Sequence, residues 1–82
     1  MWIGDNMKYE ELENKFNNYG EVRFNLLSLE YVIRKTDAGV ETFAKLYQSN
    51  KKIYSSFSES MNSFTVFNEP LIHNIDRIKI VS

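Results

Sequence analysis

The sequence predicts an α+β domain with an N-terminal helix, an antiparallel β-meander of three to four strands, and two short C-terminal helices packed on one sheet face. Two observations predict this class. Apolar residues recur every second position in the middle of the chain, as in half-buried strands, and every third or fourth position toward both ends, as in helices. Because 82 residues can enclose only a small core, we expect one domain over residues 1–82.

The first expected element is an amphipathic helix that ends at Tyr19. Asp5 or Asn6 is a suitable N-cap, and Gly20 suits a left-handed C-cap. We expect residues 1–6 to form an irregular N-terminal start. One stripe of the helix is apolar and needs a partner surface; it consists of Tyr9, Leu12, Phe16 and Tyr19.

The alternating segments predict the meander. Residues 21–26 and 29–35 each place every second side chain on an apolar face, and the short link at residues 27 and 28 allows only an antiparallel hairpin. Residues 36–39 contain the Asp and Gly of a turn. Residues 53 and 54 either form a short fourth strand or lead directly into the next helix.

The third strand, residues 40–47, has two competing faces. One face carries Val40, Thr42, Ala44 and Leu46, and the other carries Glu41, Phe43, Lys45 and Tyr47. We expect the first set to point inward. A register error of one residue would exchange the two faces and place the rings of Phe43 and Tyr47 under the helices.

The C-terminal third predicts two helices. Ser56 and Glu59 match an S-x-x-E capping box, which starts a helix over residues 56–64. After a connection, Pro70 suits the first position of the second helix. Its expected apolar stripe consists of Leu71, Ile72, Ile75 and Ile78. The tail from Lys79 either adds an edge strand or covers the core.

Composition excludes several classes of function. Ten basic and eleven acidic residues give a net charge of −1, so no long-range field attracts DNA, RNA or an anionic membrane. Without cysteine there are no disulfides, thiolate metal sites or cysteine nucleophiles. We expect neither a secretory leader nor a membrane-spanning segment, because no uninterrupted apolar run is long enough. A cytoplasmic location is therefore predicted.

The residues that carry most catalytic chemistry are sparse. His73 is the single histidine, and Glu69 and Asp76 lie four residues before it and three after it. This spacing is common on solvent-facing helices, which is the interpretation we favour. The serines lack a nucleophile elbow, and the three glycines form no phosphate-binding loop. We predict no catalytic residue, no cofactor, no metal site and no small-molecule substrate, and hence a protein that is not an enzyme.

The succession "GEVRF", "LEYVIRK" and "YSSFSES" after a leading amphipathic helix resembles small uncharacterised α-β-β-β-α proteins of low-GC Gram-positive bacteria and their phages or mobile elements. The resemblance covers most of the chain. It implies an α+β fold, but no shared activity and no role for any residue.

A partner surface is the remaining candidate. If helices cover only one sheet face, the other face exposes rings beside cations, and the possible partner-binding residues are Arg34, Phe43, Lys45 and Tyr47. We predict a protein-protein interaction or regulatory module that binds an unidentified protein or a second copy of the chain. The alternative is a nucleic-acid-binding accessory protein that uses the same aromatic and basic face, which the net charge disfavours.

Overall fold

The computed structural model describes residues 3–81, with side chains from residue 7 onward. Helix α1 (Ile3–Tyr19) leads into strands β1 (Glu21–Leu26), β2 (Leu29–Thr36) and β3 (Gly39–Ala44). A 3-10 turn η1 (Gln48–Asn50), strand β4 (Lys52–Tyr54) and helix α2 (Phe57–Ser63) follow. The chain continues through β5 (Thr65–Val66), β6 (Glu69–Pro70), the 3-10 helix η2 (Leu71–Arg77) and β7 (Lys79–Ile80).

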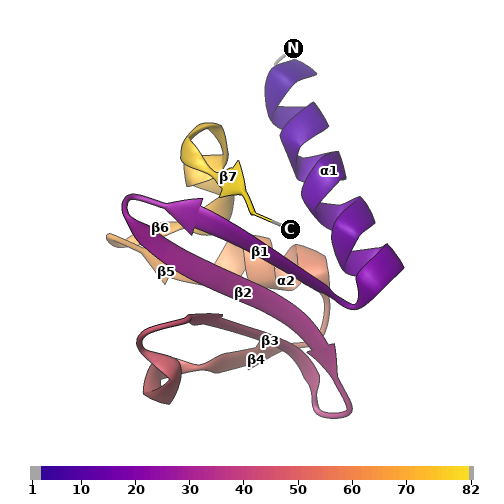
Figure 1. Cartoon of the computed structure of the whole chain (residues 1–82), viewed down its shortest axis with the longest axis vertical. Helices are drawn as coiled ribbons and strands as arrows, with labels where there is room; N and C mark the ends of the chain where they lie inside the picture. The colour runs from indigo at the N-terminus through magenta and orange to yellow at the C-terminus, as the bar shows by residue number, and fades with distance from the viewer. Residues whose placement is uncertain (1–2, 82) are drawn as a thin grey trace.

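Five strands form one antiparallel sheet in the order β4-β3-β2-β1-β7 (Figure 1). The last strand returns to the N-terminal side of the sheet, where Ile80 lies opposite Phe24 of β1. β5 and β6 form a separate two-stranded hairpin. The expected α+β class, with an N-terminal helix and an antiparallel sheet, is confirmed, and the tail is the edge strand that was one of its two alternatives.

The strand register sets which side chains enter the core. Val22 lies opposite Ile33, and Phe24 lies opposite Tyr31, so one sheet face is continuously apolar. α1 packs against β1, and α2, which lies behind the sheet in Figure 1, packs against β3 and β4. The helical side chains buried against this face are Leu12 and Phe16 of α1, Phe57 and Met61 of α2, and Leu71 and Ile75 of η2.

One polar pair joins α2 to the sheet. The hydroxyl oxygens of Thr42 and Ser60 lie 2.6 Å apart, and both residues are fully buried. A buried hydroxyl without a hydrogen-bond partner is unfavourable. Here each hydroxyl supplies the partner that the other needs. This hydrogen bond fixes where α2 sits on β3.

Val40, Thr42 and Ala44 face the helices, as expected, but Leu46 does not. β3 ends at Ala44, and the Tyr47 N–H then donates to the Ala44 carbonyl at 2.9 Å, which turns the chain away from the sheet. Leu46 is consequently exposed. The expected inward position of Leu46 is wrong.

Two expectations for α1 also need correction. The helix already includes Ile3, so neither Asp5 nor Asn6 is its cap. The irregular start expected over residues 1–6 is helical from residue 3 onward, and residues 1 and 2 lie outside the described part of the chain. Tyr19 is exposed, because Gly20 closes the helix at φ 75° and turns the chain into β1 before another side chain can reach the core.

The C-terminal third combines confirmed and corrected elements. Ser56 caps α2, since its Oγ accepts a hydrogen bond from the Glu59 N–H at 3.0 Å. The reciprocal bond is shifted by one residue: the Glu59 carboxylate accepts from the N–H and the hydroxyl of Ser55. The second predicted helix is a 3-10 helix, and Pro70 lies in β6 just before it. The predicted connection is the β5–β6 hairpin.

Candidate functional site

The structure separates the four residues that the sequence suggested as a partner surface. The register places Arg34 and Phe43 on the sheet face opposite the helices, and Lys45 follows at the end of β3. We call this surface the polar face; it comprises Glu21, Arg23, Asn25, Glu30, Val32, Arg34, Glu41 and Phe43. Tyr47 lies beyond the strand and borders a groove on the helix side.

Phe43 is covered by cations. Its residue surface is only 3% exposed. The Arg34 guanidinium carbon lies 5.2 Å from the ring centroid, and Lys51 Nζ lies 5.1 Å from it. These are cation-π distances, and the two long side chains shield the ring from solvent. Phe43 therefore stabilises the sheet and offers no free face for stacking a base or a partner ring.

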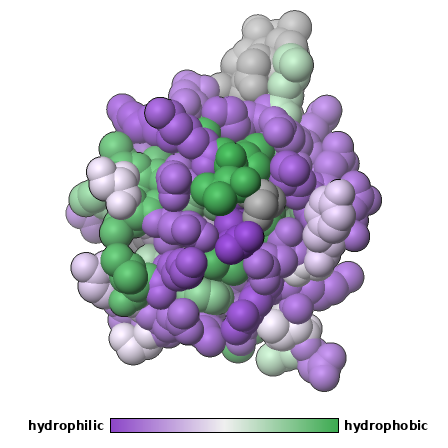
Figure 2. All heavy atoms as spheres, in the orientation of Figure 1, coloured by the Kyte–Doolittle hydropathy of each residue, from purple (hydrophilic) through white to green (hydrophobic). Residues whose placement is uncertain are grey.

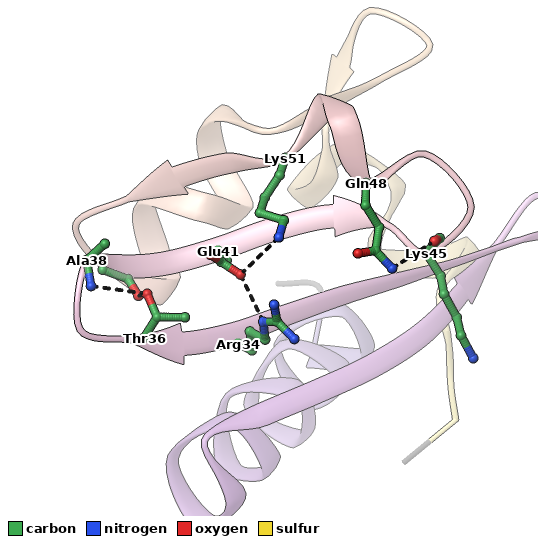
Figure 3. Close-up of polar contacts among 8 residues, drawn as sticks. Arg34, Thr36, Ala38, Glu41, Lys45, Gln48 and Lys51 are labelled. Atoms are coloured by element: carbon green, nitrogen blue, oxygen red, sulfur yellow. Dashed lines mark hydrogen bonds and ion pairs between the residues drawn. The ribbon is translucent and has the colours of Figure 1, made fainter.

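Acidic residues neutralise the same face. Arg34 Nε donates to Glu41 Oε1 at 2.8 Å, and Lys51 Nζ lies 3.8 Å from that oxygen (Figure 3). Glu30 lies 3.9 Å from both Arg23 Nη1 and Lys45 Nζ. Alternating charges of this kind make a hydrophilic surface without a strong field of one sign.

A second surface lies at one end of the sheet, on the helix side. It is a groove of about 410 Å³, within the size range of binding pockets. The strand side of its lining consists of Leu29, Tyr31, Ala44, Tyr47, Asn50, Lys52 and Tyr54. The other side consists of Ser63, Phe64, Thr65, Val66 and Phe67.

The fold explains this lining. Lys52 and Tyr54 lie opposite Thr42 and Val40, so β4 presents them on the helix side of the sheet. Phe64 ends α2 and meets the ring of Tyr31 edge to face, at a centroid distance of 6.2 Å. Aromatic residues thus line both walls of the groove.

Two tyrosines of the groove have shifted proton affinities. Burial raises the pKa of Tyr31. Burial raises the pKa of Tyr54 too, and the negative charge of Glu59 raises it further. Both phenols stay protonated at neutral pH and serve as hydrogen-bond donors.

Exposed apolar side chains line the groove or lie close to its lining in the sequence. Tyr47 and Phe67 belong to the lining, and Leu27 and Leu46 lie within two residues of the lining residues Leu29 and Ala44; we call these four residues, together with the groove, the apolar end. The β1–β2 and β5–β6 tips lie on the same side of the molecule (Figure 1). Apolar residues gather along that side, on the left in Figure 2, and a second apolar cluster lies near the middle of this face among hydrophilic residues. The apolar end is the more hydrophobic of the two candidate surfaces, because its four apolar residues are exposed, whereas Val32 and Phe43 of the polar face are buried.

Both hairpin tips hold bulky residues in left-handed backbone conformations. Leu27 and Ser28 have φ 51° and 76°, and Phe67 and Asn68 have φ 54° and 66°. Two positive φ values in a two-residue turn are typical of a type I′ hairpin, which favours Asn-Gly. Leu and Phe at its first position are strained by roughly 1 kcal/mol each.

The sequence placed the Leu27–Ser28 hairpin but missed the groove. The groove combines side chains from six segments, which no local pattern brings together. A usable signal was Asn68, a residue that tolerates positive φ, between two extended pairs. It could have identified the β5–β6 hairpin and the exposed Phe67 at its tip.

Other candidate residues remain on the surface. His73 Nδ1 lies 3.9 Å from Glu69 Oε1, and both side chains are more than half exposed. Within residues 3–81, no group of three His, Cys, Asp or Glu side chains is placed to hold a metal ion. No helix in that range is both long enough and apolar enough to cross a membrane.

No protein-family model, no curated protein and no solved structure matches this chain. Function is therefore inferred from the chemistry of the apolar end and the polar face.

Proposed function

We propose that this domain is a non-catalytic protein-interaction module whose contact surface is the apolar end. The observation that carries the proposal is the pair of strained, exposed tips: Leu27 is 49% exposed and Phe67 is 73% exposed, both at positive φ. At these positions Asn or Gly would suit the turn better and would be more soluble. Strained apolar residues beside a groove are the pattern expected of a binding surface.

The composition of the groove supports binding over catalysis. Tyr and Phe supply large, rigid contact areas and are enriched at the centres of protein interfaces. Among the described lining residues, the titratable groups are three phenols and one ammonium, with no carboxylate or imidazole. Such a set lacks a base that works near neutral pH.

The covered ring of Phe43 weakens the nucleic-acid alternative. Single-strand binders stack bases on accessible aromatic faces in a basic groove. Here the side chains of Arg34 and Lys51 cover the ring of Phe43, and both cations pair with the Glu41 carboxylate. The test below therefore also measures whether the domain retains short single-stranded DNA or RNA at low salt.

The test displays fragments of the genome that encodes the chain and selects those that bind the wild-type domain. Each retained fragment is then measured against Leu27→Asn/Phe67→Asn, which removes both apolar tips while suiting the turns. Tyr19→Asn is the matched control, because Tyr19 is an exposed aromatic residue at the end of α1, away from the apolar end. Sedimentation of the same three proteins detects a tip-dependent dimer.

We expect protein fragments, or a second copy, to bind wild type and Tyr19→Asn but not the tip variant. The proposal is wrong if every retained fragment binds the tip variant equally well. It is also wrong if the domain selects no protein but retains short single-stranded DNA or RNA at low salt.

A further inference from the structure

The β5–β6 hairpin leaves one strand edge unpaired beside the groove. Thr65 lies opposite Pro70, and the Leu71 N–H donates to the Phe64 carbonyl at 2.9 Å. In antiparallel pairs, hydrogen-bonded and non-hydrogen-bonded positions alternate, so Thr65 and Pro70 occupy a non-hydrogen-bonded position. Pro70, which has no N–H, suits that position. The N–H and C=O of Thr65 therefore point away from β6.

The groove lies on this unpaired side. All residues from Ser63 to Phe67 contribute to its described lining, whereas Glu69 and Pro70 of β6 do not. An extended chain in the groove would find the backbone of Thr65 available for pairing, as in recognition by strand addition. The aromatic walls would hold its side chains.

The groove has one charge of its own. Lys52 is the charged residue among the described lining, and neither an ion pair nor a hydrogen bond joins its ammonium to another described residue. Its neighbour Lys51 differs, because it points to the polar face and pairs with Glu41. An unpaired cation at an aromatic groove selects for an anionic group on the occupant.

We propose that the groove binds an extended segment of a partner protein that carries a carboxylate close to an apolar side chain. The segment pairs with the Thr65 backbone, its apolar side chain packs between Tyr31, Tyr47 and Phe64, and its carboxylate meets Lys52. This occupant deepens the proposed function and rests on it. The groove volume limits direct contact to a short stretch of the segment.

A random peptide library provides the probe. Peptides are selected on the wild-type domain, and the most enriched sequence is synthesised twice, once as selected and once with each Asp or Glu replaced by Asn or Gln. Binding of both peptides is measured by fluorescence anisotropy to wild type, Lys52→Met and Lys35→Met. Lys35 is the control, because it is exposed near the β2–β3 turn at the far end of the sheet.

We expect acidic peptides to be enriched and to bind wild type and Lys35→Met about fivefold more tightly than their amide versions. Lys52→Met should remove that preference while still binding both peptides. Hydrogen exchange at the Thr65 amide should slow when the acidic peptide binds, because the amide gains an acceptor.

Three results would overturn the inference: no enriched peptide, an acidic preference that survives in Lys52→Met, or unchanged exchange at Thr65. The two proposals fail in distinguishable ways. If the binding of protein fragments requires the tips but is unaffected by Lys52→Met, the acidic segment is rejected and the interaction module is retained. A tip-dependent dimer without peptide binding assigns the groove to a second copy. If neither a protein fragment nor a second copy binds in a tip-dependent manner, both proposals are rejected.

Discussion

Replacing Phe67 by Asn tests directly whether the β5–β6 tip is strained by the residue that it carries. Phe67 has φ 54°, which costs a bulky residue about 1 kcal/mol, and Asn tolerates this region better. Since the residue is 73% exposed, about a quarter of its surface is buried, and truncation loses roughly 0.5 kcal/mol of hydrophobic stabilisation. The free energy of unfolding should therefore rise by about 0.5 kcal/mol, which corresponds to about 2–4 °C in Tm.

Phe67→Ala is the matched comparison. Ala loses the same buried surface but keeps the strain of an ordinary residue at positive φ, so it should be about 0.5 kcal/mol less stable than wild type. Thermal and urea unfolding followed by circular dichroism measure both differences. If Phe67→Asn is no more stable than Phe67→Ala, the tip is unstrained and the ring has a structural role.

Three further predictions concern the rest of the fold. Thr42→Val should destabilise the domain by about 1–3 kcal/mol in urea unfolding, because the Ser60 hydroxyl loses its buried partner; Thr42→Val/Ser60→Ala should recover most of this loss, and no recovery would show that the pair is uncoupled. Phe43→Ser should cost about 3 kcal/mol in the same assay, because the ring is buried under Arg34 and Lys51; an unchanged midpoint would make Phe43 a surface residue. Hydrogen bonds from the Ser55 backbone N–H and then its hydroxyl lower the pKa of Glu59 below its ordinary value of 4.5. The folded state therefore binds this proton less tightly, so the carboxylate contributes stability above that value and loses it as the pH falls through the lowered pKa. The stability advantage of wild type over Glu59→Gln should shrink from about pH 7 to about pH 3, and a constant difference would exclude this cause.

The long strands could be predicted because their apolar alternation continues over several residues. Val22, Phe24 and Ile33 repeat every second position, and a slip by one would bury their charged neighbours. The short strands carry no such signal. β5, β6 and β7 have two residues each, too few to define a period, and their pairing depends on tertiary contacts.

Local hydrogen bonds explain other differences. Apolar spacing predicted that β3 would continue to Tyr47, but a turn closed by the Ala44 carbonyl ends it earlier. The i, i+4, i+7 spacing of Leu71, Ile75 and Ile78 fits the 3.6-residue period of an α-helix better than the three-residue period of a 3-10 helix, so apolar spacing indicated the wrong helix type.

The partner surface was predictable only in part. Period-two reasoning placed Arg34 and Phe43 on one face, and the structure agrees. It could not show that Arg34 and Lys51 would fold over the ring, because long flexible side chains have many rotamers. The prediction placed Tyr47 on that face because it extended the third strand to residue 47. The strand ends at Ala44, and Tyr47 lies at the groove instead.

The location of the partner contact is the central claim, and comparing two variants in one binding measurement tests it most directly. The protein fragment with the highest affinity for wild type is titrated against Leu27→Asn/Phe67→Asn and against Lys45→Ala; the exposed Lys45 side chain lies next to the polar face, where it pairs with Glu30. Loss of two central apolar contacts should weaken binding about 30-fold or more, while Lys45→Ala should leave it within about twofold of wild type. Unchanged affinity of the tip variant, with strong loss in Lys45→Ala, would place the contact on the polar face and contradict the account.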